Sequence, residues 1–546
     1  MKTTDVVIVG SGPNGLLMAC ELALAGVRPV VLERLPERNT SPKANGLVGR
    51  VVQMLDYRGL YERFSRSTEP PTPAPYFQFG ALFLDMSEWD GNSLYTLPVP
   101  QYRMEELLEQ RAHELGVEIR RGHEVTELGQ DADGVTVDVR GPDGSYRLTA
   151  GFLVGADGGH SGIRKQAGIG FPGITDKSFV GRSGQVTIHP PVAVPGTGEL
   201  EVPGLGRLWP ATFTRTENGV FAFGMFQPGV YRVSVFEWDR PAAKDRAFTP
   251  VEDLREAVNR VLGVDVPMSD PADGQGPPPV RDTNGINSRL ADRYRQGRVF
   301  LVGDAAHVQS GVGGPGLNLG MQDVINLAWK LAADVNGWAP EGLLDTYQSE
   351  RRPAAERVIM SSRAQTALLS PGPNITALRE VFTELLGDQG NVRRISNLMS
   401  GADVRYDMRS DGSAHPITGG WMPNLALATE NGPTRVADLM HAARPILLDL
   451  AGRADLVEAA SDWADRVDAV TATCEDRPAD AVLIRPDGYV AWAAAPGTSG
   501  GADALRQALR TWFGLPVQAT SLTGADLHQA NPAQRPAHRA TQRPAG

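Results

Sequence analysis

The amino-acid sequence predicts an α/β protein in which an antiparallel sheet is inserted into a parallel one and a smaller α/β domain follows. Three observations lead to this prediction. The chain opens with a strand, a glycine-rich turn and a helix, as in a βαβ unit. Aromatic residues alternate along short stretches between about 175 and 280, and strand–helix patterns return after that region. A length of 546 residues suffices for about three or four domains.

Composition excludes several classes of protein. With 41% hydrophobic and 21% charged residues, the chain is globular and not largely disordered. The 53 basic and 64 acidic residues give a net charge of −11, which argues against a nucleic-acid partner. The sequence contains no run of about twenty apolar residues, so no membrane span is predicted. The N-terminus lacks the pattern of a signal peptide. Cys20 and Cys474 are the two cysteines, which excludes a disulfide framework and suggests the reducing cytoplasm.

The first βαβ unit occupies about thirty residues. We expect a strand over 6–9, a turn over 10–15, a helix over 16–25 that ends at Gly26, and a second strand over 30–32. The turn reads Gly-Ser-Gly-Pro-Asn-Gly, and Glu33 ends the second strand. This spacing is typical of a dinucleotide-binding site.

Each glycine of that turn has a physical role. Gly10 permits the tight turn, Gly12 lets a pyrophosphate approach the backbone, and Gly15 allows the helix to pack on the strand. The helix N-terminus, with Pro13 and Asn14, offers N–H groups and partial positive charge to the pyrophosphate. The carboxylate of Glu33 is placed to accept hydrogen bonds from ribose hydroxyls.

Two later strand ends favour FAD over NAD as the dinucleotide. Residues 153–161 close a strand with Asp157 and two glycines, and 298–307 close another with Asp304. The carboxylate of Asp304 can hold a ribityl hydroxyl. After a glycine-rich loop, a helix begins at about Gly316, Leu317 and Asn318, whose N–H groups would face the electron-rich edge of an isoalloxazine ring.

The remaining elements follow from periodicity and turn residues. The sequence predicts a helix over 105–115, strands over 117–119 and 135–139, a hairpin turn over 142–144, a strand over 298–303, a helix over 317–335, a strand over 446–448 and a strand–turn–strand over 482–492. The last thirty residues are rich in Ala, Pro, Gln, Arg and Thr, and we expect them to be disordered.

The aromatic stretches supply candidates for contact with a flat substrate. Phe213, Phe223 and Phe226 alternate along the predicted sheet, although aromatic residues on strands are more often part of the core. Arg232 and Glu237 lie in the same region and are interpreted as a surface pair. His160 and His307 follow acidic residues, but no third ligand stands at metal spacing, so no metal site is expected.

These motifs, in this order, resemble those of the flavin monooxygenases related to p-hydroxybenzoate hydroxylase, and most closely the hydroxylases that tailor aromatic polyketides. The resemblance extends over about residues 4–515. It is carried also by the segments 122–125, 135–142, 320–331, 347–353 and 483–492.

The resemblance implies an FAD domain in two parts (1–175 and 281–400), a substrate sheet (176–280), a thioredoxin-like domain without redox cysteines (401–516) and the tail (517–546). It implies that Gln101 and Glu105 open a helix beside the ribityl chain and that Val125 lies near the adenine. Arg34, Lys43 and Pro315 join the residues expected to bind FAD. NADPH is favoured over NADH as the reductant of FAD, and O₂ then forms a flavin C4a-hydroperoxide that hydroxylates a polycyclic aromatic ring.

Three departures from the family pattern leave the outcome open. Ser310 and Gly311, followed by Val312, replace the usual proline beside the flavin ring; Pro315 replaces a common Gln, and Lys43 a common Arg, although Arg50 is retained. Baeyer–Villiger or ring-rearranging oxygenation and antibiotic inactivation are alternatives to simple hydroxylation. So are a flavin-holding protein without turnover and a simple NAD dehydrogenase. The sequence does not decide whether the chain forms a homodimer.

Overall fold

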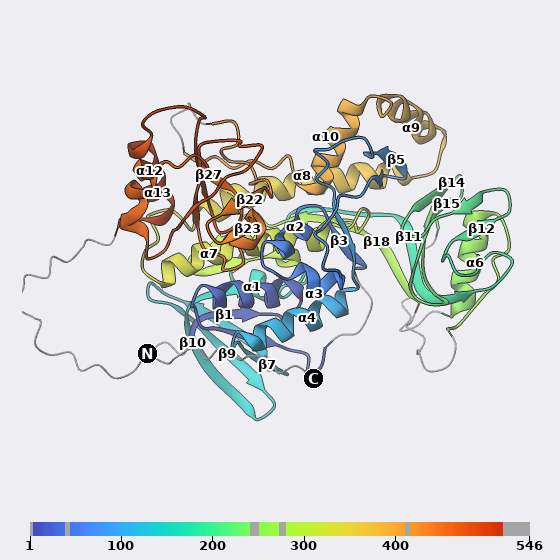
Figure 1. Cartoon of the computed structure of the whole chain (residues 1–546). Coiled ribbons are helices and arrows are strands. Elements are labelled where there is room, and N and C mark those ends of the chain that lie inside the picture. The colour runs from blue at the N-terminus through green and yellow to red at the C-terminus, as the bar shows by residue number, and fades with distance from the viewer. Residues whose placement is uncertain (1–3, 39–43, 241–249, 272–279, 410–414, 517–546) are drawn as a thin grey trace, which may run out of the picture.

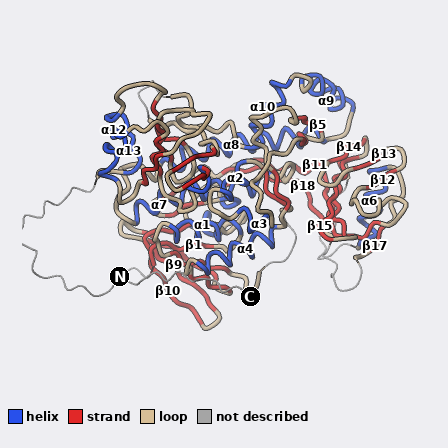
Figure 2. The backbone as a smooth tube through the Cα atoms, viewed as in Figure 1, coloured by secondary structure: helices blue, strands red, loops and turns tan. Residues whose placement is uncertain are grey.

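The computed structural model describes residues 4–38, 44–240, 250–271, 280–409 and 415–516 (Figure 1). Two predictions fall outside these ranges: the binding role of Lys43 and the disorder of 517–546. Within them, most strands belong to two large sheets and one four-stranded sheet, and helices pack against all three (Figure 2). In the described part of the chain, no helix combines the length and apolarity needed to cross a bilayer.

The first large sheet is parallel at its centre. Its central strands, in spatial order, are β7 (Glu118–Arg121), β2 (Pro29–Glu33), β1 (Thr4–Val9), β10 (Gly144–Gly155) and β20 (Val299–Leu301). At the margins, β19 (Arg295–Gln296), β9 (Val135–Gly141) and β8 (Glu124–Gln130) pair antiparallel. Because the centre of a parallel sheet is covered on both faces, β1, β2, β10 and β20 contain continuous apolar runs. Segments from 4–155 and 295–301 therefore build one sheet, and the carboxyl ends of β1, β10 and β20 meet at one edge.

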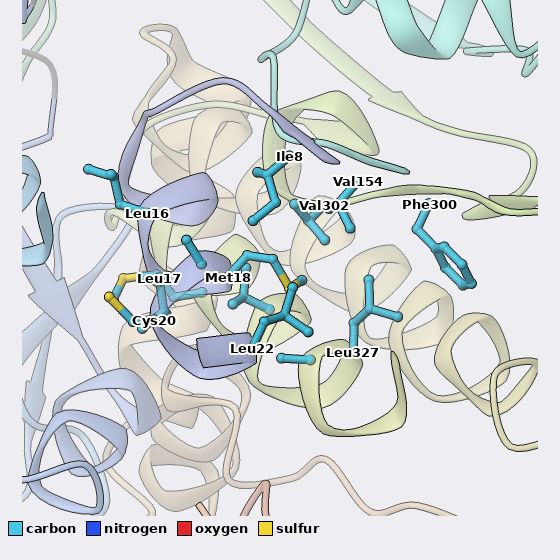
Figure 3. Close-up of a cluster of buried hydrophobic side chains, with 14 of the residues drawn as sticks. Ile8, Leu16, Leu17, Met18, Cys20, Leu22, Val154, Phe300, Val302 and Leu327 are labelled. Atoms are coloured by element: carbon cyan, nitrogen blue, oxygen red, sulfur yellow. The ribbon is translucent and has the colours of Figure 1, made fainter. Parts of the chain in front are cut away.

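Helix α1 (Pro13–Leu24) packs on this sheet together with α4 (Gln101–Glu114) and α7 (Pro315–Val335). Figure 3 shows Leu17 and Leu22 of α1 gathered with Ile8 of β1 and Leu327 of α7. Cys20 belongs to the same core. Burial raises the pKa of its thiol to about 12, so Cys20 is a packing residue and not a reactive one.

Shorter elements surround the parallel sheet. They are β3 (Gly46–Val48), α2 (Arg50–Asp56), α3 (Tyr61–Ser65), β4 (Tyr76–Phe79), β5 (Leu82–Asp85), β6 (Thr96–Pro98), α5 (Gly162–Gln166), the 3₁₀ turn η1 (Gly303–Ala305), α8 (Thr346–Leu369), α9 (Pro373–Leu385) and α10 (Gln389–Ser400). Strand β3 pairs with β6, and β4 pairs with β5 as a hairpin.

The second large sheet is the predicted antiparallel insertion. It runs β14 (Phe213–Thr216), β15 (Gly219–Gln227), β16 (Val230–Trp238), β11 (Gly173–Ile188), β18 (Arg281–Leu290) and β21 (His307–Val308); β17 (Met268–Ser269) pairs with β11, and β12 (Leu200–Val202) pairs with β13 (Gly206–Leu208) outside the sheet. Helix α6 (Val251–Leu262) covers one face of the sheet. Helix α6 was not predicted, and neither was the membership of β18 and β21, which come from beyond residue 280, in this sheet.

The C-terminal region has its own four-stranded sheet, ordered β25 (Asp468–Thr471), β24 (Ile446–Asp449), β26 (Ala481–Ile484) and β27 (Val490–Ala494). Its other elements are β22 (Ala426–Thr429), β23 (Gly432–Arg435), α11 (Val436–Leu439), α12 (Ala454–Ala460), η2 (Ser461–Trp463) and α13 (Ala502–Phe513). Trp463 of η2 and Trp512 of α13 are both 1% exposed and fill the core of this region.

Buried polar contacts fasten the C-terminal region to the rest of the molecule. The Arg58 guanidinium pairs with Glu21 of α1 at 2.9 Å and donates to the Pro486 carbonyl at 2.7 Å. The Tyr57 hydroxyl donates to the Met422 carbonyl at 2.7 Å. Arg50 begins α2, and its guanidinium lies 5.1 Å from the centre of the Trp421 ring. Residues of the C-terminal region and of the segment 50–58 are therefore buried against each other.

Candidate functional site

The glycine turn between β1 and α1 has the geometry that its sequence requires. Gly10 has a φ of +105°, and a Cβ there would lie 2.5 Å from the Ala156 carbonyl oxygen. A Cβ at Gly15 would lie 1.9 Å from the carbonyl oxygen of Gly10. Gly12 differs, because a Cβ there would meet nothing within 4 Å. The protein itself does not require a glycine at Gly12, and that position is open to a ligand.

The start of α1 faces this open position. Pro13 is the first helical residue, and the first intrahelical hydrogen bond runs from the Leu16 N–H to the Gly12 carbonyl. The N–H groups of Asn14 and Gly15 precede that bond and are available to an anion. A pyrophosphate fits this arrangement of donors.

Glu33 holds the turn in place from the end of β2. Its Oε2 accepts from the Ser11 N–H at 2.8 Å and the Ser11 hydroxyl at 3.1 Å, while Oε1 accepts from the Leu35 N–H at 2.9 Å. A carboxylate has about four acceptor positions. Glu33 therefore retains acceptor capacity for ribose hydroxyls beside its structural contacts.

The three predicted turns converge at the edge of the sheet. A Cβ at Gly303 would lie 2.0 Å from Asn14 Nδ2, so the first and third turns touch. Arg164 joins the second and third turns, because its Nη1 donates to the Ala305 carbonyl at 2.8 Å and its Nη2 to the Gly159 carbonyl at 3.0 Å. Asp157 Oδ2 accepts from the Ile163 N–H at 3.1 Å, within the second turn.

The third turn leads into the N-terminus of α7. Gly314 caps the helix with a φ of +69°, and Pro315 is the first helical residue. Gly316, Leu317 and Asn318 then supply the first N–H groups of the helix. The Asn318 side chain is engaged within the protein: Oδ1 accepts from the Val48 N–H at 2.9 Å and Nδ2 donates to the Gly314 carbonyl at 2.5 Å. It connects β3 to the helix start.

Asp304 lies on the exposed side of η1, between two buried neighbours. Gln309 lies close by: a Cβ at Gly316 would be 3.4 Å from Gln309 Nε2 and 3.9 Å from Asp304 Oδ1. Both polar atoms of the Gln309 side chain are buried without a hydrogen-bond partner within the described residues. Acceptor, donor and helix N-terminus thus face one position, which fits the hydroxyl-rich ribityl chain and polar ring edge of FAD.

The loop over 310–312 joins this position to the inserted sheet. Ser310 is buried, and its carbonyl accepts from the Ser362 hydroxyl at 3.1 Å. A Cβ at Gly311 would meet nothing within 4 Å. Val312 packs with Val220 and Leu369, and Phe213 is packed against this group. Phe213 therefore lies on the sheet face next to the loop.

The alternation of strands separates the aromatic candidates onto two faces. Phe213 pairs with Ala222, so it lies on the face opposite to Phe221 and Phe223. Phe223 is 4% exposed and packs in the core against α6. This burial corrects the prediction that Phe223 contacts substrate. Phe226 stands in β15, but its side chain is outside what the structure describes.

The predicted surface pair of Arg232 and Glu237 is wrong. The two residues are five apart on β16, so their side chains point to opposite faces. Glu237 is 2% exposed and bonds to Arg182 at 2.9 Å and to Arg260 of α6 at 2.9 Å. It is a structural residue of the core against α6.

The remaining predicted FAD residues occupy different surroundings. Gln101 begins α4; its Nε2 donates to Glu105 Oε1 at 2.8 Å, and its backbone N–H donates to the Ala44 carbonyl at 3.0 Å. The helix thus begins four residues before the predicted start. Val125 pairs with Val139 in the β8–β9 hairpin, and Arg34 is exposed after β2.

Three residues of this site were not predicted from the sequence: Arg164, Gln309 and Asp323, a buried residue of α7. Arg164 acts on a segment 141 residues away, Gln309 lies in the loop after Asp304, and Asp323 lies in the segment 320–331, where no role of its own was predicted for it. His307 is buried and bonds to Asp323, while His160 is exposed. Among the described residues, no group of three or more His, Cys, Asp or Glu side chains is placed to hold a metal ion.

Comparison with known proteins agrees with this geometry. Residues 3–362 match the family described as FAD binding domain, and 415–516 match the family described as aromatic-ring hydroxylase, C-terminal. A 12-dehydrotetracycline 5-monooxygenase/anhydrotetracycline 6-monooxygenase of Streptomyces rimosus is 45% identical over 94% of this chain and 99% of its own. A rifampicin monooxygenase of Streptomyces venezuelae is 39% identical over 90% of this chain and 95% of its own.

Solved structures show the same fold. The OxyS anhydrotetracycline hydroxylase from Streptomyces rimosus superposes with a TM-score of 0.82 and 42% identity, covering 95% of this chain and 100% of that one. The Rossmann-type FAD domain and the mixed α/β class predicted from sequence are confirmed. The chain belongs to the FAD-binding aromatic-ring hydroxylases, a family of flavin-dependent monooxygenases.

Proposed function

We propose that this protein uses FAD, NADPH and O₂ to hydroxylate a polycyclic aromatic polyketide. The observation that carries the proposal is the convergence of the three turns on the open backbone at Gly12 and the N-terminus of α7, directly beside the loop that packs on the inserted sheet. Bound FAD supplies electron transfer from the nicotinamide and activation of oxygen. The protein supplies binding, orientation and exclusion of water.

The roles proposed for the chain follow from its donors and acceptors. The N–H groups of Asn14 and Gly15 bind the pyrophosphate, and Glu33 accepts from ribose hydroxyls. Asp304 accepts from the ribityl chain. The N–H groups at the start of α7 stabilise negative charge at the polar edge of the reduced ring. Arg34, Lys43, Gln101, Val125 and Pro315 remain proposed FAD contacts on the family resemblance.

The substrate is proposed to lie between the 310–312 loop and the adjoining face of the inserted sheet. Phe213 and Val220 supply apolar surface there, and Val312 supplies it from the loop. A flat aromatic substrate suits such an apolar face, which would orient the ring and, with the substrate bound, exclude water from it. The relatives are named for 12-dehydrotetracycline, anhydrotetracycline and rifampicin as substrates.

Further properties belong to the same proposal. We place the protein in the cytoplasm, with NADPH favoured over NADH and a homodimer as one possible assembly. We divide the chain into an FAD domain (1–175 and 281–400), a substrate sheet (176–280), a thioredoxin-like domain (401–516) and a tail (517–546). The C-terminal sheet with its flanking helices supports that division.

Anaerobic reduction followed by oxygen tests the proposal. NADPH should bleach the bound flavin faster in the presence of anhydrotetracycline than without it, and admission of O₂ should give a product heavier by one oxygen atom with its rings intact. A ring-expanded lactone would show Baeyer–Villiger chemistry instead. Protection of a sensitive host from rifampicin would favour antibiotic inactivation, for which a relative is named. Flavin that NADPH cannot reduce under any of these conditions would refute turnover.

A further inference from the structure

A chain of buried charged groups lies directly behind the turn that carries Asp304. The Asp323 carboxylate and the His307 ring both have side chains that are 0% exposed, and His307 Nε2 lies 2.7 Å from Asp323 Oδ2. The same oxygen accepts from the Gly303 N–H at 3.3 Å. Asp323 therefore contacts both ends of the segment 303–307, while Asp304 lies on its exposed side.

Arg351 of α8 fixes Asp323 from the other side. Its Nε donates to Asp323 Oδ1 at 2.8 Å, and its Nη1 donates to the Tyr406 hydroxyl at 2.9 Å. Burial opposes the ionised carboxylate, but the contacts with His307 and Arg351 hold the pKa of Asp323 below its usual range. The carboxylate remains an acceptor with all its partners in place.

The neighbouring residue on α8 extends the contacts into the C-terminal region. Glu350 accepts from Arg485 Nη1 at 2.7 Å and from Lys330 Nζ at 2.7 Å. The Tyr406 ring lies 4.1 Å, centre to centre, from the ring of Tyr489. Glu350 and Arg351, which are consecutive residues of α8, thus connect Arg485 and Tyr406 of the C-terminal region to the turn that carries Asp304.

Packing alone does not explain this arrangement. An apolar side chain of similar volume would fill the space without desolvating a charge. A carboxylate with three fixed donors instead selects one position for the turn, since each bond restricts it in a different direction. We infer that Asp323, held by Arg351, is a positioning residue that sets the place of Asp304 for FAD binding.

This inference rests on the proposed function, because it assumes that Asp304 binds the ribityl chain. The first test compares Asp323→Asn with Glu21→Gln in the full-length protein. Both changes remove the charge of a buried carboxylate that is paired with an arginine. Glu21, however, lies on α1, where it pairs with Arg58 at 2.9 Å, and its contacts do not reach the turn that carries Asp304. Both variants should unfold at lower temperature than the wild type.

The two variants should differ in how they bind FAD. Asp323→Asn should weaken FAD binding at least tenfold in a fluorescence titration and shift the visible circular dichroism of the remaining bound flavin. Glu21→Gln should keep the wild-type spectrum and bind FAD within about twofold. Equal FAD binding by the two variants would overturn the inference. A wild-type chain that takes up no FAD would overturn the proposed function instead.

A second pair of variants keeps the test decisive if Asp323→Asn does not fold. His307→Gln retains an amide N–H that can reach Asp323, whereas His307→Leu has similar bulk and no donor. His307→Gln should retain most of the wild-type FAD affinity and the wild-type flavin spectrum, whereas His307→Leu should retain neither. Equal behaviour of the two would show that His307 and Asp323 merely fill space.

Discussion

Substitution of Gly15 by alanine tests whether close packing of α1 on its turn is needed to build the FAD site. The added Cβ would lie 1.9 Å from the backbone oxygen of Gly10, where ordinary contacts begin at 3.4 Å. The helix and the turn would have to separate by roughly 1.5 Å, and no flexible side chain can absorb that shift. We expect the free energy of unfolding to fall by about 3 kcal/mol, the upper end for overpacked cores.

Gly12→Ala is the matched control, because its Cβ would meet no protein atom within 4 Å. Gly12 is the N-cap of α1, where alanine is less favourable than glycine, so the FAD-free protein should lose only about 0.5–1 kcal/mol of stability. Bound FAD, however, would meet the new methyl group at the pyrophosphate. Affinity should fall at least tenfold, which corresponds to ~1.4 kcal/mol.

Urea unfolding of the FAD-free variants and FAD titration followed by fluorescence measure the two effects separately. Gly15→Ala should lose affinity and about 3 kcal/mol of stability, and Gly12→Ala should lose affinity with a much smaller loss of stability. If Gly12→Ala bound FAD as tightly as the wild type, the pyrophosphate could not lie where we place it. If Gly15→Ala unfolded at the wild-type urea concentration, the contact with Gly10 would not constrain the fold.

Three further changes have defined outcomes. Asp304→Ala should lower the FAD content of the purified protein, measured by absorbance; unchanged content would contradict its ribityl contact. Gly311→Pro should change the ratio of product formed to NADPH consumed, since it stiffens the loop beside the substrate, and an unaltered ratio would remove that loop from the chemistry. Burial lowers the pKa of Lys330 from 10.5 to about 8, with Glu350 opposing the shift. Because the unfolded chain binds this proton and the folded chain does not, stability from Lys330 should rise by about 3 kcal/mol between pH 8 and 10.5. The difference in urea stability between Lys330→Met and the wild type should follow that rise, and a pH-independent difference would refute it.

Local sequence predicted the part of the site that local geometry determines. Gly10 must be a glycine because of its positive φ and its close approach to Ala156, directly after the neighbouring strand β10. Gly15 must be a glycine because it lies against the backbone of Gly10, five residues earlier. The start of α7 was predicted to within two residues: the expected helix over 317–335 begins at Pro315, a residue that is favoured at the first helical position. The confirmed predictions of the fold class and of FAD rest on these signals.

The parts that failed depend on contacts between distant segments. Alternation along β15 correctly separates two faces, but only the position of α6 decides which face is core, and so Phe223 was misassigned. Glu237 was read as exposed because its partners Arg182 and Arg260 lie on other elements. No spacing rule links Arg164 to Ala305 across 141 residues, although both belong to the site.

The two segments of the chain that match the family models, 3–362 and 415–516, share buried contacts, and this limits how such chains can be recombined. Glu21 and Arg58 lie within the first matched segment, yet Arg58 also bonds to Pro486 in the second. A chimera that took its first segment from this protein and its second from a relative would have to reproduce those bonds atom for atom. Exchange of the C-terminal segment alone should therefore yield insoluble protein unless the residues that face it are transplanted along with it.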